Sequence, residues 1–369
     1  MKIMIAIFVI LTLIMLVSGH AFLWWSFVRF FAISKITIKI FLAVLLGLMS
    51  LSFIVSTFIV HWSENWLADK FYLVSGVWLG LIWYVAIAVA ATWIFYWVGQ
   101  WTDIEMPLRT ISIIFMTMAI AYTIYGMVNA FTPIVRSEEV LLKNLPAAWQ
   151  SKKIVHLSDI HLGTVHKKPF MQNIVDEVNG LKPDIVFITG DIFDGAGQTL
   201  NHMLQPINNI NAPLGIYAII GNHETYLSLD KSLAAIKDTK IKLLRDEVAE
   251  VNGIQIAGID YPMPGEEHDI EDILNKLDKN KATIVLYHEP KEDVWEKIKE
   301  AGGDLMLSGH THKGQLWPFG RITKMMYGPY HQGLHKIDDF YINTSSGIGT
   351  WGPPMKTTGH SEIIEITLK

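Results

Sequence analysis

Four stretches in the first 135 residues contain no Asp, Glu, Lys or Arg, and they constrain the fold of this 369-residue chain more than any other feature. They are Ile3 to Val28, Ile40 to Ser63, Phe71 to Thr102 and Thr110 to Val135. Each is longer than the roughly 20 residues that a helix needs to cross the hydrocarbon core of a bilayer. We therefore expect four transmembrane helices and a multi-pass protein of the cell membrane.

The charged residues divide the sequence into two unlike parts. Residues 1–135 hold 10 of the 65 charged side chains, and residues 136–369 hold the other 55. This distribution predicts two domains, a helical membrane module over residues 1–135 and a soluble domain over residues 136–369. The soluble part carries 24 Lys and Arg against 31 Asp and Glu, a net charge of −7. An acidic domain argues against nucleic acid as the partner.

The first apolar stretch has a second interpretation. Lys2 precedes it and Ser18 to Ala21 follow its apolar core, a pattern that also fits a cleaved signal peptide. The bulky residues after Ala21 favour a span that is retained. The spans offer only His20 and His61 as ionisable groups, both near helix ends, so an anchor is favoured over a transporter.

Basic residues between the spans predict the orientation, because Lys and Arg resist translocation. The first connector, residues 29–39, carries three basic residues and no acid, and the third carries Arg109. The second has Lys70 together with two acids. With the first and third connectors in the cytoplasm, four spans place the C-terminal domain on the extracytoplasmic face. Arg136 and Lys143, just beyond the fourth span, favour the opposite orientation.

Short apolar runs alternate with polar or amphipathic segments in the soluble part. Continuous apolar runs of this length are typical of strands covered on both faces. After a strand-like Val140 to Leu142, the expected strands are Lys153 to Leu157, Asp184 to Thr189, Gly215 to Ile220, Ile254 to Ile259, Ala282 to Tyr287 and Leu305 to Leu307. The expected helices are Pro169 to Gly180, Asp230 to Asp238, Ile270 to Leu277 and Glu292 to Ala301. The alternation predicts an α/β domain of stacked layers.

Polar residues of metal-ligand type stand where these strands end, except after the Ile254 run. They are Asp159, His161, Asp191, Asn222, His223, Glu224, His288, His310 and His312. Ligands bind at the carboxyl ends of strands in open α/β sheets, so we expect these side chains to converge on one crevice. Residues two apart in an extended segment point the same way, so each Asp-x-His or His-x-His pair can address one point or two neighbouring points.

In order, these groups resemble the calcineurin-like metallophosphoesterase superfamily across the whole soluble domain. Ser158 to Gly163, Gly309 to Gln315 and Thr344 to Pro354 are similar to its bacterial membrane-associated phosphodiesterase branch, which includes hydrolases of the UDP-diacylglucosamine pyrophosphate bond. The resemblance implies a four-layer α/β/β/α sandwich. It also implies a metal-dependent phosphohydrolase, a phosphodiesterase rather than a phosphomonoesterase.

Carried over residue by residue, the resemblance implies two divalent metal ions bridged by Asp191. It assigns Asp159, His161 and His312 to one ion, and Asn222, His288 and His310 to the other. Nitrogen and oxygen ligands in a chain without Cys suit Mn²⁺, Fe or Zn²⁺, and manganese is the expected metal. Hydrolysis would then proceed through a hydroxide that bridges the two ions.

Two residues are candidates for contact with the substrate. The resemblance casts His223 as a phosphate contact and as the acid for the leaving oxygen, which makes it a catalytic residue beside Asp191. The alternative is that His223 only orients Asn222. Lys356 stands where this branch often has an arginine, and a lysine can pair with phosphate only as a point charge.

Other polar residues are expected to have structural roles. Asp194 and Glu224 should support the ligands rather than bind metal themselves. His156 lies inside the Lys153 strand, so we expect a hydrogen-bonded histidine of the core.

The segment after the last histidine pair carries aromatic, apolar and basic residues together. They are Trp317, Phe319, Met325, Met326, Tyr327 and Tyr330, with Arg321 and Lys324 between them. This composition suits a lipid-linked phosphate presented at the bilayer surface. An equally simple explanation is a capping loop over residues 316–335 with a small apolar core of its own.

The sequence thus predicts a membrane-anchored phosphoesterase that hydrolyses a phosphodiester or pyrophosphate bond. Its partners would be membrane lipid and a phosphorylated, lipid-linked substrate; the sequence does not define the oligomeric state. One alternative is a tethered enzyme that acts on soluble substrates. Another is a non-catalytic, metal-stabilised adaptor, which would be expected to lack Asp191, Asn222 or His223, yet all three are present.

Overall fold

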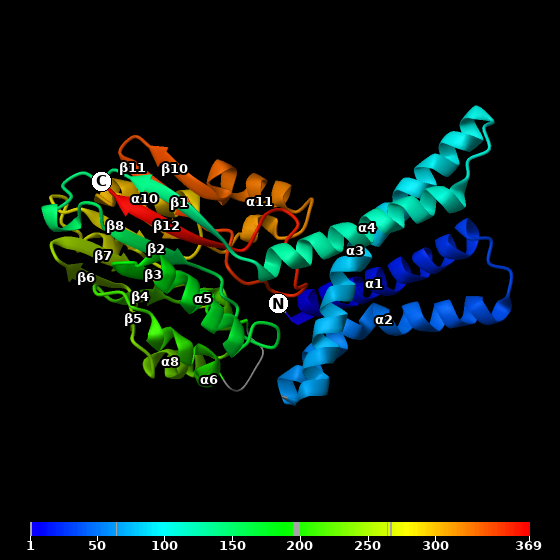
Figure 1. The fold of residues 1–369 in the computed structure, drawn as a ribbon, viewed down its shortest axis with the longest axis horizontal. Coiled ribbons are helices and arrows are strands. Elements are labelled where there is room, and N and C mark those ends of the chain that lie inside the picture. The colour runs from blue at the N-terminus through cyan, green and yellow to red at the C-terminus, as the bar shows by residue number, and fades with distance from the viewer. Residues whose placement is uncertain (1, 64, 195–199, 264, 266–267) are drawn as a thin grey trace. The chain divides into compact units, whose positions relative to one another are not determined.

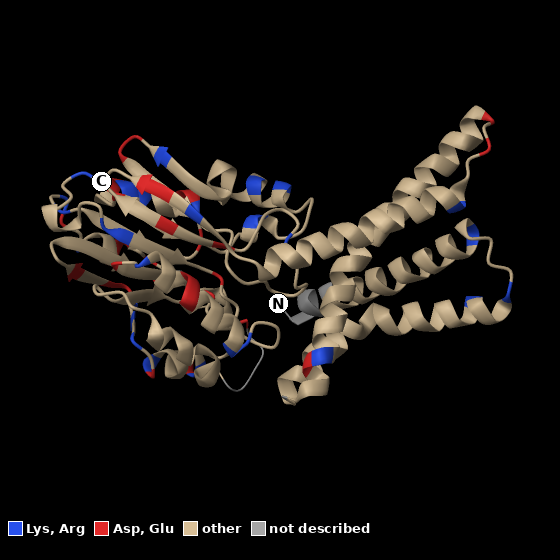
Figure 2. Ribbon diagram, in the orientation of Figure 1, with Lys and Arg blue, Asp and Glu red and all other residues tan. Residues whose placement is uncertain are grey.

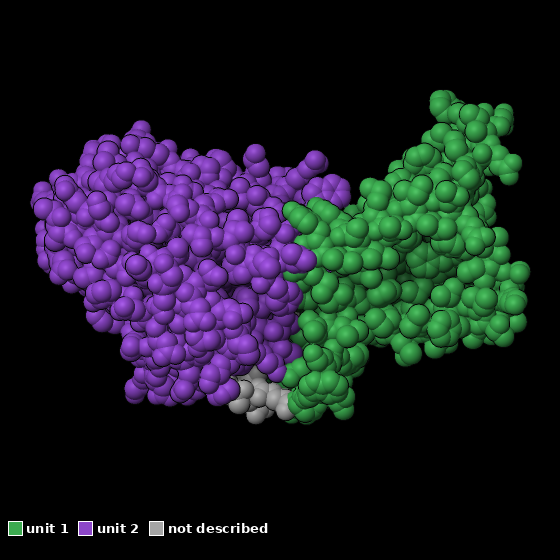
Figure 3. All heavy atoms as spheres, in the orientation of Figure 1, with its two compact units in different colours: residues 1–127, 352–354 green, residues 128–351, 355–369 purple. Residues whose placement is uncertain are grey.

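The structure, a computed structural model, describes residues 2–63, 65–194, 200–263, 265 and 268–369. It forms two compact units (Figures 1 and 3). One comprises residues 1–127 with 352–354, and the other comprises residues 128–351 with 355–369. The boundary between the two units, at residues 127 and 128, therefore falls within the fourth apolar stretch. The domain boundary between residues 135 and 136, inferred from charge, stays a prediction.

The first unit is helical, as the four charge-free stretches predict. Its helices are α1 (Lys2–Phe30), α2 (Ile36–Trp62), α3 (Trp66–Thr102) and α4 (Leu108–Phe131), and α4 continues into the second unit. All four helices are long and apolar enough to cross a membrane. The α4 helix ends before Val135, because Pro133 cannot continue a helix and disfavours the helical conformation at Thr132.

Several polar side chains within the helical unit hydrogen-bond across it. Trp78 Nε1 donates to His20 Nε2 at 3.1 Å, and the Ser56 and Ser75 hydroxyls are 2.6 Å apart. Charged residues lie at the helix ends and in the connectors (Figure 2). Both features suit helices in a bilayer, where no water is available to hydrogen-bond a buried polar group.

The second unit contains two six-stranded sheets. The first has the order β1 (Ile134–Val140), β12 (Glu362–Leu368), β2 (Lys153–Leu157), β3 (Ile185–Thr189), β4 (Ile216–Ile219) and β5 (Ile241–Leu243). The second has the order β10 (Gly333–Ile337), β11 (Phe340–Thr344), β9 (Leu305–Ser308), β8 (Thr283–Leu286), β7 (Ile254–Gly258) and β6 (Glu247–Val251). The central strands β2 to β5 and β7 to β9 run parallel. Their carboxyl ends therefore share one edge in each sheet.

Three hydrophobic layers hold these sheets together, because alternate residues of each strand face opposite sides. Between the sheets pack Ile154 and Phe187 from the first sheet, and Ile284 and Leu307 from the second. Val155 and the neighbouring strands face α5 (Lys168–Leu181), α6 (Leu200–Leu204) and α8 (Leu229–Lys237). The outer face of the second sheet packs against α9 (Glu271–Leu274) and α10 (Glu292–Ala301). The predicted α/β/β/α sandwich is confirmed.

The strands and helices expected from the sequence are present, with ends shifted by at most a few residues. The apolar runs of β2, β3, β4, β7, β8 and β9 are buried on both faces, as predicted. The elements not anticipated are the short or polar ones, β5, β6, β10, β11, β12, α6, α7 (Asn222–Leu227) and α11 (Gly320–Tyr327). The strand near Val140 begins earlier than expected, at Ile134. Only Thr132 and Pro133 separate it from α4.

Substitution of Trp149 tests how much the packing between the two sheets stabilises the fold. Its side chain is fully buried and its Nε1 donates to the Val251 carbonyl at 3.1 Å. We expect Trp149→Ala to lower the free energy of unfolding by about 3–5 kcal/mol, because it leaves a large cavity. Trp149→Phe retains most of the packing, so it should cost clearly less. Chemical unfolding of the purified protein in detergent measures both, and equal losses would contradict a packing role.

Candidate metal centre

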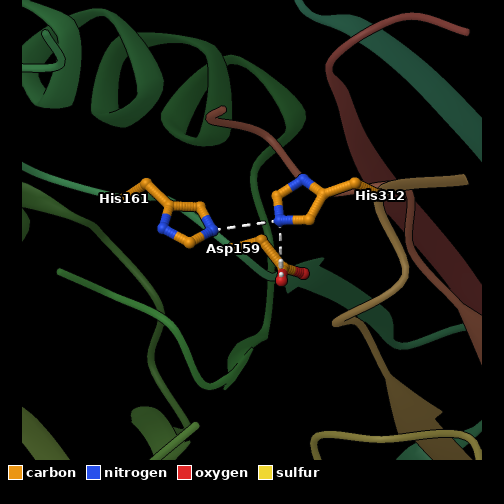
Figure 4. A group of neighbouring side chains, drawn as sticks. All are labelled: Asp159, His161 and His312. Carbon is orange, nitrogen blue, oxygen red and sulfur yellow. Dashed lines mark hydrogen bonds and ion pairs between the residues drawn. The ribbon is translucent and has the colours of Figure 1, made fainter. Parts of the chain in front are cut away.

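The first group of candidate ligands joins two loops that are far apart in the sequence. Asp159 and His161 follow β2, and His312 follows β9. His161 Nε2 and His312 Nε2 are 3.0 Å apart, and His312 Nε2 is 3.4 Å from Asp159 Oδ1 (Figure 4). All three side chains are buried, and their ligand atoms lie within 4.8 Å of one another.

The second group gathers at the ends of β3, β4, β8 and β9. His288 Nδ1 must donate a hydrogen bond to the Thr189 carbonyl, 2.7 Å away, because a carbonyl can only accept. His288 Nε2 then points at Asn222 Oδ1 at 3.0 Å and at Asp191 Oδ2 at 3.3 Å. His310 Nδ1 lies 2.9 Å from the same amide oxygen. The Asp191, His288 and His310 ligand atoms also lie within 4.8 Å of one another.

Asp191 lies between the two groups. Its Oδ2 is 3.3 Å from His288 Nε2 and 3.9 Å from His161 Nε2. Its Oδ1 accepts a hydrogen bond from the main-chain N–H of His223 at 2.9 Å. One carboxylate oxygen thus faces histidines of both groups, while the other is held by the backbone.

Metal ligands must be neutral imidazoles and ionised carboxylates, and four of the candidate ligands are held in that state. Burial, together with nearby His223, holds the pKa of His161 well below its usual value. Burial, together with His161, does the same for His312, and burial lowers the pKa of His310 to about 4. Although burial alone would raise it, the pKa of Asp191 is held well below its usual value by His288.

The cluster of acceptors requires a positive charge at its centre. Burial opposes charging of His288, but the carboxylate of Asp191 outweighs it and raises the histidine pKa to about 10. A proton on His288 Nε2 can therefore balance the site. A divalent cation can do the same, since the donors are nitrogen and oxygen atoms converging within coordination range.

The backbone that presents these ligands is not extended, contrary to our expectation. The φ angles are +51° at Asp159, His161 and Asp191, +69° at His310 and +46° at His312. Side chains two apart converge because the chain turns in the left-handed region, which costs free energy for residues other than glycine. The side chains of each pair do converge, but not because the segment is extended: the strands end just before the ligands begin.

Glycines provide the space in which these turns pack. A Cβ added to Gly221 would lie 2.6 Å from the Asp191 main-chain nitrogen and would meet its carboxylate. A Cβ added to Gly309 would lie 2.8 Å from Ser158 Cβ and would meet the Asp159 carboxylate. The ligand carboxylates are therefore packed directly against the backbone of the neighbouring strand ends.

Glu224 ties the loops together without facing the centre. Its Oε2 accepts hydrogen bonds from the Gly221 N–H at 2.8 Å and the Asp191 N–H at 3.0 Å, and its Oε1 accepts one from the Phe193 N–H at 3.0 Å. Asp194 lies closer to the site: its carboxylate is 3.6 Å from His161 Nδ1. With His161 and His223 it forms a third group whose ligand atoms lie within 4.8 Å of one another.

His223 has a defined orientation. Its Nδ1 donates to the Asp194 carbonyl at 3.1 Å, which fixes the tautomer and leaves Nε2 for the crevice. Its ring centre is 4.6 Å from that of His161 and 6.4 Å from that of the half-exposed Trp351. His223 is thus placed at the mouth of the site, beside the first group of ligands.

Lys356 and His156 both lie in the protein interior, away from the crevice side of the ligands. Lys356 is 1% exposed, and its Nζ donates to the main-chain carbonyls of Ser346 and Gly347. These contacts support the loop behind Asp159, so the role of Lys356 as a substrate contact stays a prediction. His156 is a hydrogen-bonded histidine of the core, as expected, with contacts to Asn343 and Thr189.

An aromatic and acidic wall lies beside the second group of ligands. It consists of Tyr261, Glu289 and Tyr327, and the sequence predicted none of the three as a site residue. Tyr261 follows β7, the one strand thought to end without a functional residue, and its ring centre lies 5.8 Å from that of His288. Tyr327 donates from its hydroxyl to Glu289 Oε1 at 2.6 Å, and Glu289 Oε1 is 3.7 Å from His310 Nε2. Glu289 directly follows His288, and Tyr327 lies in the aromatic segment after His312, so the sequence offered a signal for these two but none for Tyr261.

Comparisons with known proteins agree with this arrangement. A family model for the calcineurin-like phosphoesterases matches residues 152–314. The chain is 36% identical over 222 residues to an uncharacterized metallophosphoesterase of Helicobacter pylori, covering 58% of this chain and 59% of that protein. It is 32% identical over 264 residues to an uncharacterized metallophosphoesterase of Aquifex aeolicus, covering 69% and 98% of the two chains. It is 29% identical over 358 residues to a transmembrane protein with metallophosphoesterase domain from Danio rerio, covering 91% and 80%.

The fold and the buried Asp and His groups define a metallophosphoesterase with membrane helices. This chain belongs to the calcineurin-like phosphoesterase family. It spans 59% of the length of its Helicobacter relative, so the activity of the whole protein is a matter for proposal.

Gly221 gives a test of the packed carboxylates. We expect Gly221→Ala to weaken binding of divalent cations by roughly tenfold or more, because the new Cβ displaces Asp191. Titration with Mn²⁺, followed by elemental analysis of bound metal, measures the change. Gly180→Ala is the matched control, since nothing lies within 4 Å of the added Cβ. Unchanged metal binding in Gly221→Ala would contradict the packing argument.

Proposed function

We propose that this protein is a membrane-anchored, dinuclear-metal phosphoesterase that hydrolyses a phosphodiester or pyrophosphate bond of a lipid-linked substrate. The observation that carries the proposal is the position of Asp191 Oδ2, within 3.9 Å of histidines in both ligand groups. Two divalent cations, with Mn²⁺ the expected metal, would lower the pKa of a shared water and neutralise the phosphoryl oxygens. We assign Asp159, His161 and His312 to one cation, and Asn222, His288 and His310 to the other.

His223 supplies the proton in this proposal. Its Nδ1–H is committed to the Asp194 carbonyl, so the acid would be the imidazolium form of the ring, which transfers its Nε2 proton to the leaving oxygen and returns to the neutral imidazole. Asp194 and Glu224 keep the loops that carry His223 and Asp191 in place. The presence of every candidate ligand at one edge of the sheets, all of them buried except the half-buried His310, argues against an adaptor that has lost catalysis.

Two features favour a lipid-linked substrate over a soluble one. Only Thr132 and Pro133 separate the end of the apolar helix α4 from β1, so the catalytic unit cannot move far from the bilayer. Aromatic, apolar and basic residues also follow His312 directly in the chain. Given the charge distribution of the connectors, the catalytic unit of the proposal faces the extracytoplasmic side.

Two substitutions test the chemistry. We expect Mn²⁺-dependent hydrolysis of bis-p-nitrophenyl phosphate by the full-length protein in detergent, faster than hydrolysis of p-nitrophenyl phosphate. Asp191→Ala should abolish it, because both cations lose a ligand. His223→Ala should lower kcat by about 10²–10⁴ while bound metal is unchanged. Lower metal affinity in His223→Ala would instead show that His223 only orients Asn222.

The substrate class is tested by competition between two kinds of ester. The proposal expects faster turnover of a phosphodiester or pyrophosphate in lipid micelles than of soluble nucleotides. Much faster cleavage of the nucleotides would overturn the lipid-linked substrate and leave the phosphoesterase assignment intact.

The orientation can be tested because the chain has no Cys. Asn280→Cys introduces a single thiol in an exposed turn before β8, at the strand edge opposite the metal centre. We expect a membrane-impermeant maleimide to label it in intact spheroplasts. Labelling that requires lysis would place the catalytic unit in the cytoplasm.

A further inference from the structure

The helix α11 carries an apolar face that no part of the described chain covers. Met325 is 86% exposed, Met326 is 67% exposed and Ile322 is 52% exposed. These residues are spaced i, i+3 and i+4, so they share one side of the helix. The half-buried residues Thr323 and Tyr327 lie on the other side, toward the protein. Such a cluster on one short helix marks an interaction surface rather than scattered surface residues.

The charges around this face indicate which surface it contacts. Arg321 and Lys324 lie next to each other on the side of the helix beyond Met325, and neither forms an ion pair with any carboxylate in the described part of the chain. Figure 2 shows the basic residues along α11. Apolar side chains bordered by free cations are typical of helices that lie in the interface of an anionic bilayer. The exposed Trp317, just before α11, adds a side chain that prefers the same region.

The same helix reaches the metal centre at its other end. Tyr327, its last residue, donates to Glu289, and its ring centre lies 6.2 Å from that of His310. Tyr327 alone therefore links α11, and any surface that α11 contacts, to His310, a candidate ligand of the second cation.

We propose that α11 docks on the surface of a lipid bilayer through Ile322, Met325 and Met326, with Arg321 and Lys324 at anionic headgroups. The docked helix sets the crevice at the height of the lipid headgroups. This surface is distinct from the catalytic residues, so docking and hydrolysis can be tested separately.

Single cysteines provide the test, since the native chain has none. Met325→Cys and the control Asn280→Cys are labelled with an environment-sensitive fluorophore, and the full-length protein is reconstituted into vesicles containing phosphatidylglycerol. We expect lipids carrying a nitroxide to quench the label at position 325 and aqueous iodide to quench the label at position 280. Replacing phosphatidylglycerol with phosphatidylcholine should weaken the lipid quenching at position 325, because it removes the anionic headgroups.

Two outcomes would overturn the proposal. Equal iodide quenching at both positions would show that α11 faces water. Protection of position 325 from both quenchers would show that a protein, such as a second copy of the chain, covers the helix.

A charged variant gives a functional readout. We expect Ile322→Glu with Met325→Glu to lower hydrolysis of a vesicle-borne phosphodiester by roughly tenfold, because both side chains lose their apolar contact with lipid. Hydrolysis of bis-p-nitrophenyl phosphate in detergent should be unchanged, which also shows that the variant folds. Unchanged hydrolysis on vesicles would contradict docking, whereas no hydrolysis by the native protein under either condition would instead refute the proposed function.

Discussion

The need to balance charge in a buried place governs the catalytic half of this protein. Asp159, Asp191 and Glu224 are all buried, and four imidazoles converge on the first two. Isolated charges of this kind are costly to bury unless they are paired or coordinate a cation. The main chain supplies part of the compensation, through N–H groups that donate to each carboxylate. The remaining acceptors face one another, and this uncompensated arrangement makes the cluster a candidate metal site.

The sheets make such an arrangement possible because they end together. Parallel strands from both sheets stop at one edge, and the chain then turns through left-handed residues at Asp159, Asp191 and His310. Conformations of this kind persist only where the surroundings determine them. Here the surroundings are the buried strands on one side and glycines such as Gly221 and Gly309 on the other. The stability of the sandwich is thus used to hold a strained set of ligands.

The sequence predicted the parts of the molecule whose signal is local. Continuous apolar runs located the central strands, and the absence of charge located the four long helices. All the candidate ligands could be named, because each follows such a run. The left-handed backbone was not predictable, since the same pairs fit an extended segment. Tyr261 was missed, and Tyr327 was expected in the aromatic segment but not against Glu289, because both reach the site only through tertiary packing; the burial of Lys356 has the same cause.

The helical part of the chain passes into the catalytic unit through a very short connection, from α4 to β1. Two residues, even fully extended, span only about 7 Å, so β1 begins within a short distance along the chain from the end of α4. A tether this short brings no advantage for a substrate that diffuses freely in water. For a phosphate that belongs to a lipid, it restricts enzyme and substrate to the same thin layer and raises their effective concentration. If α11 docks as we propose, its exposed apolar face would in addition set the direction in which the crevice opens.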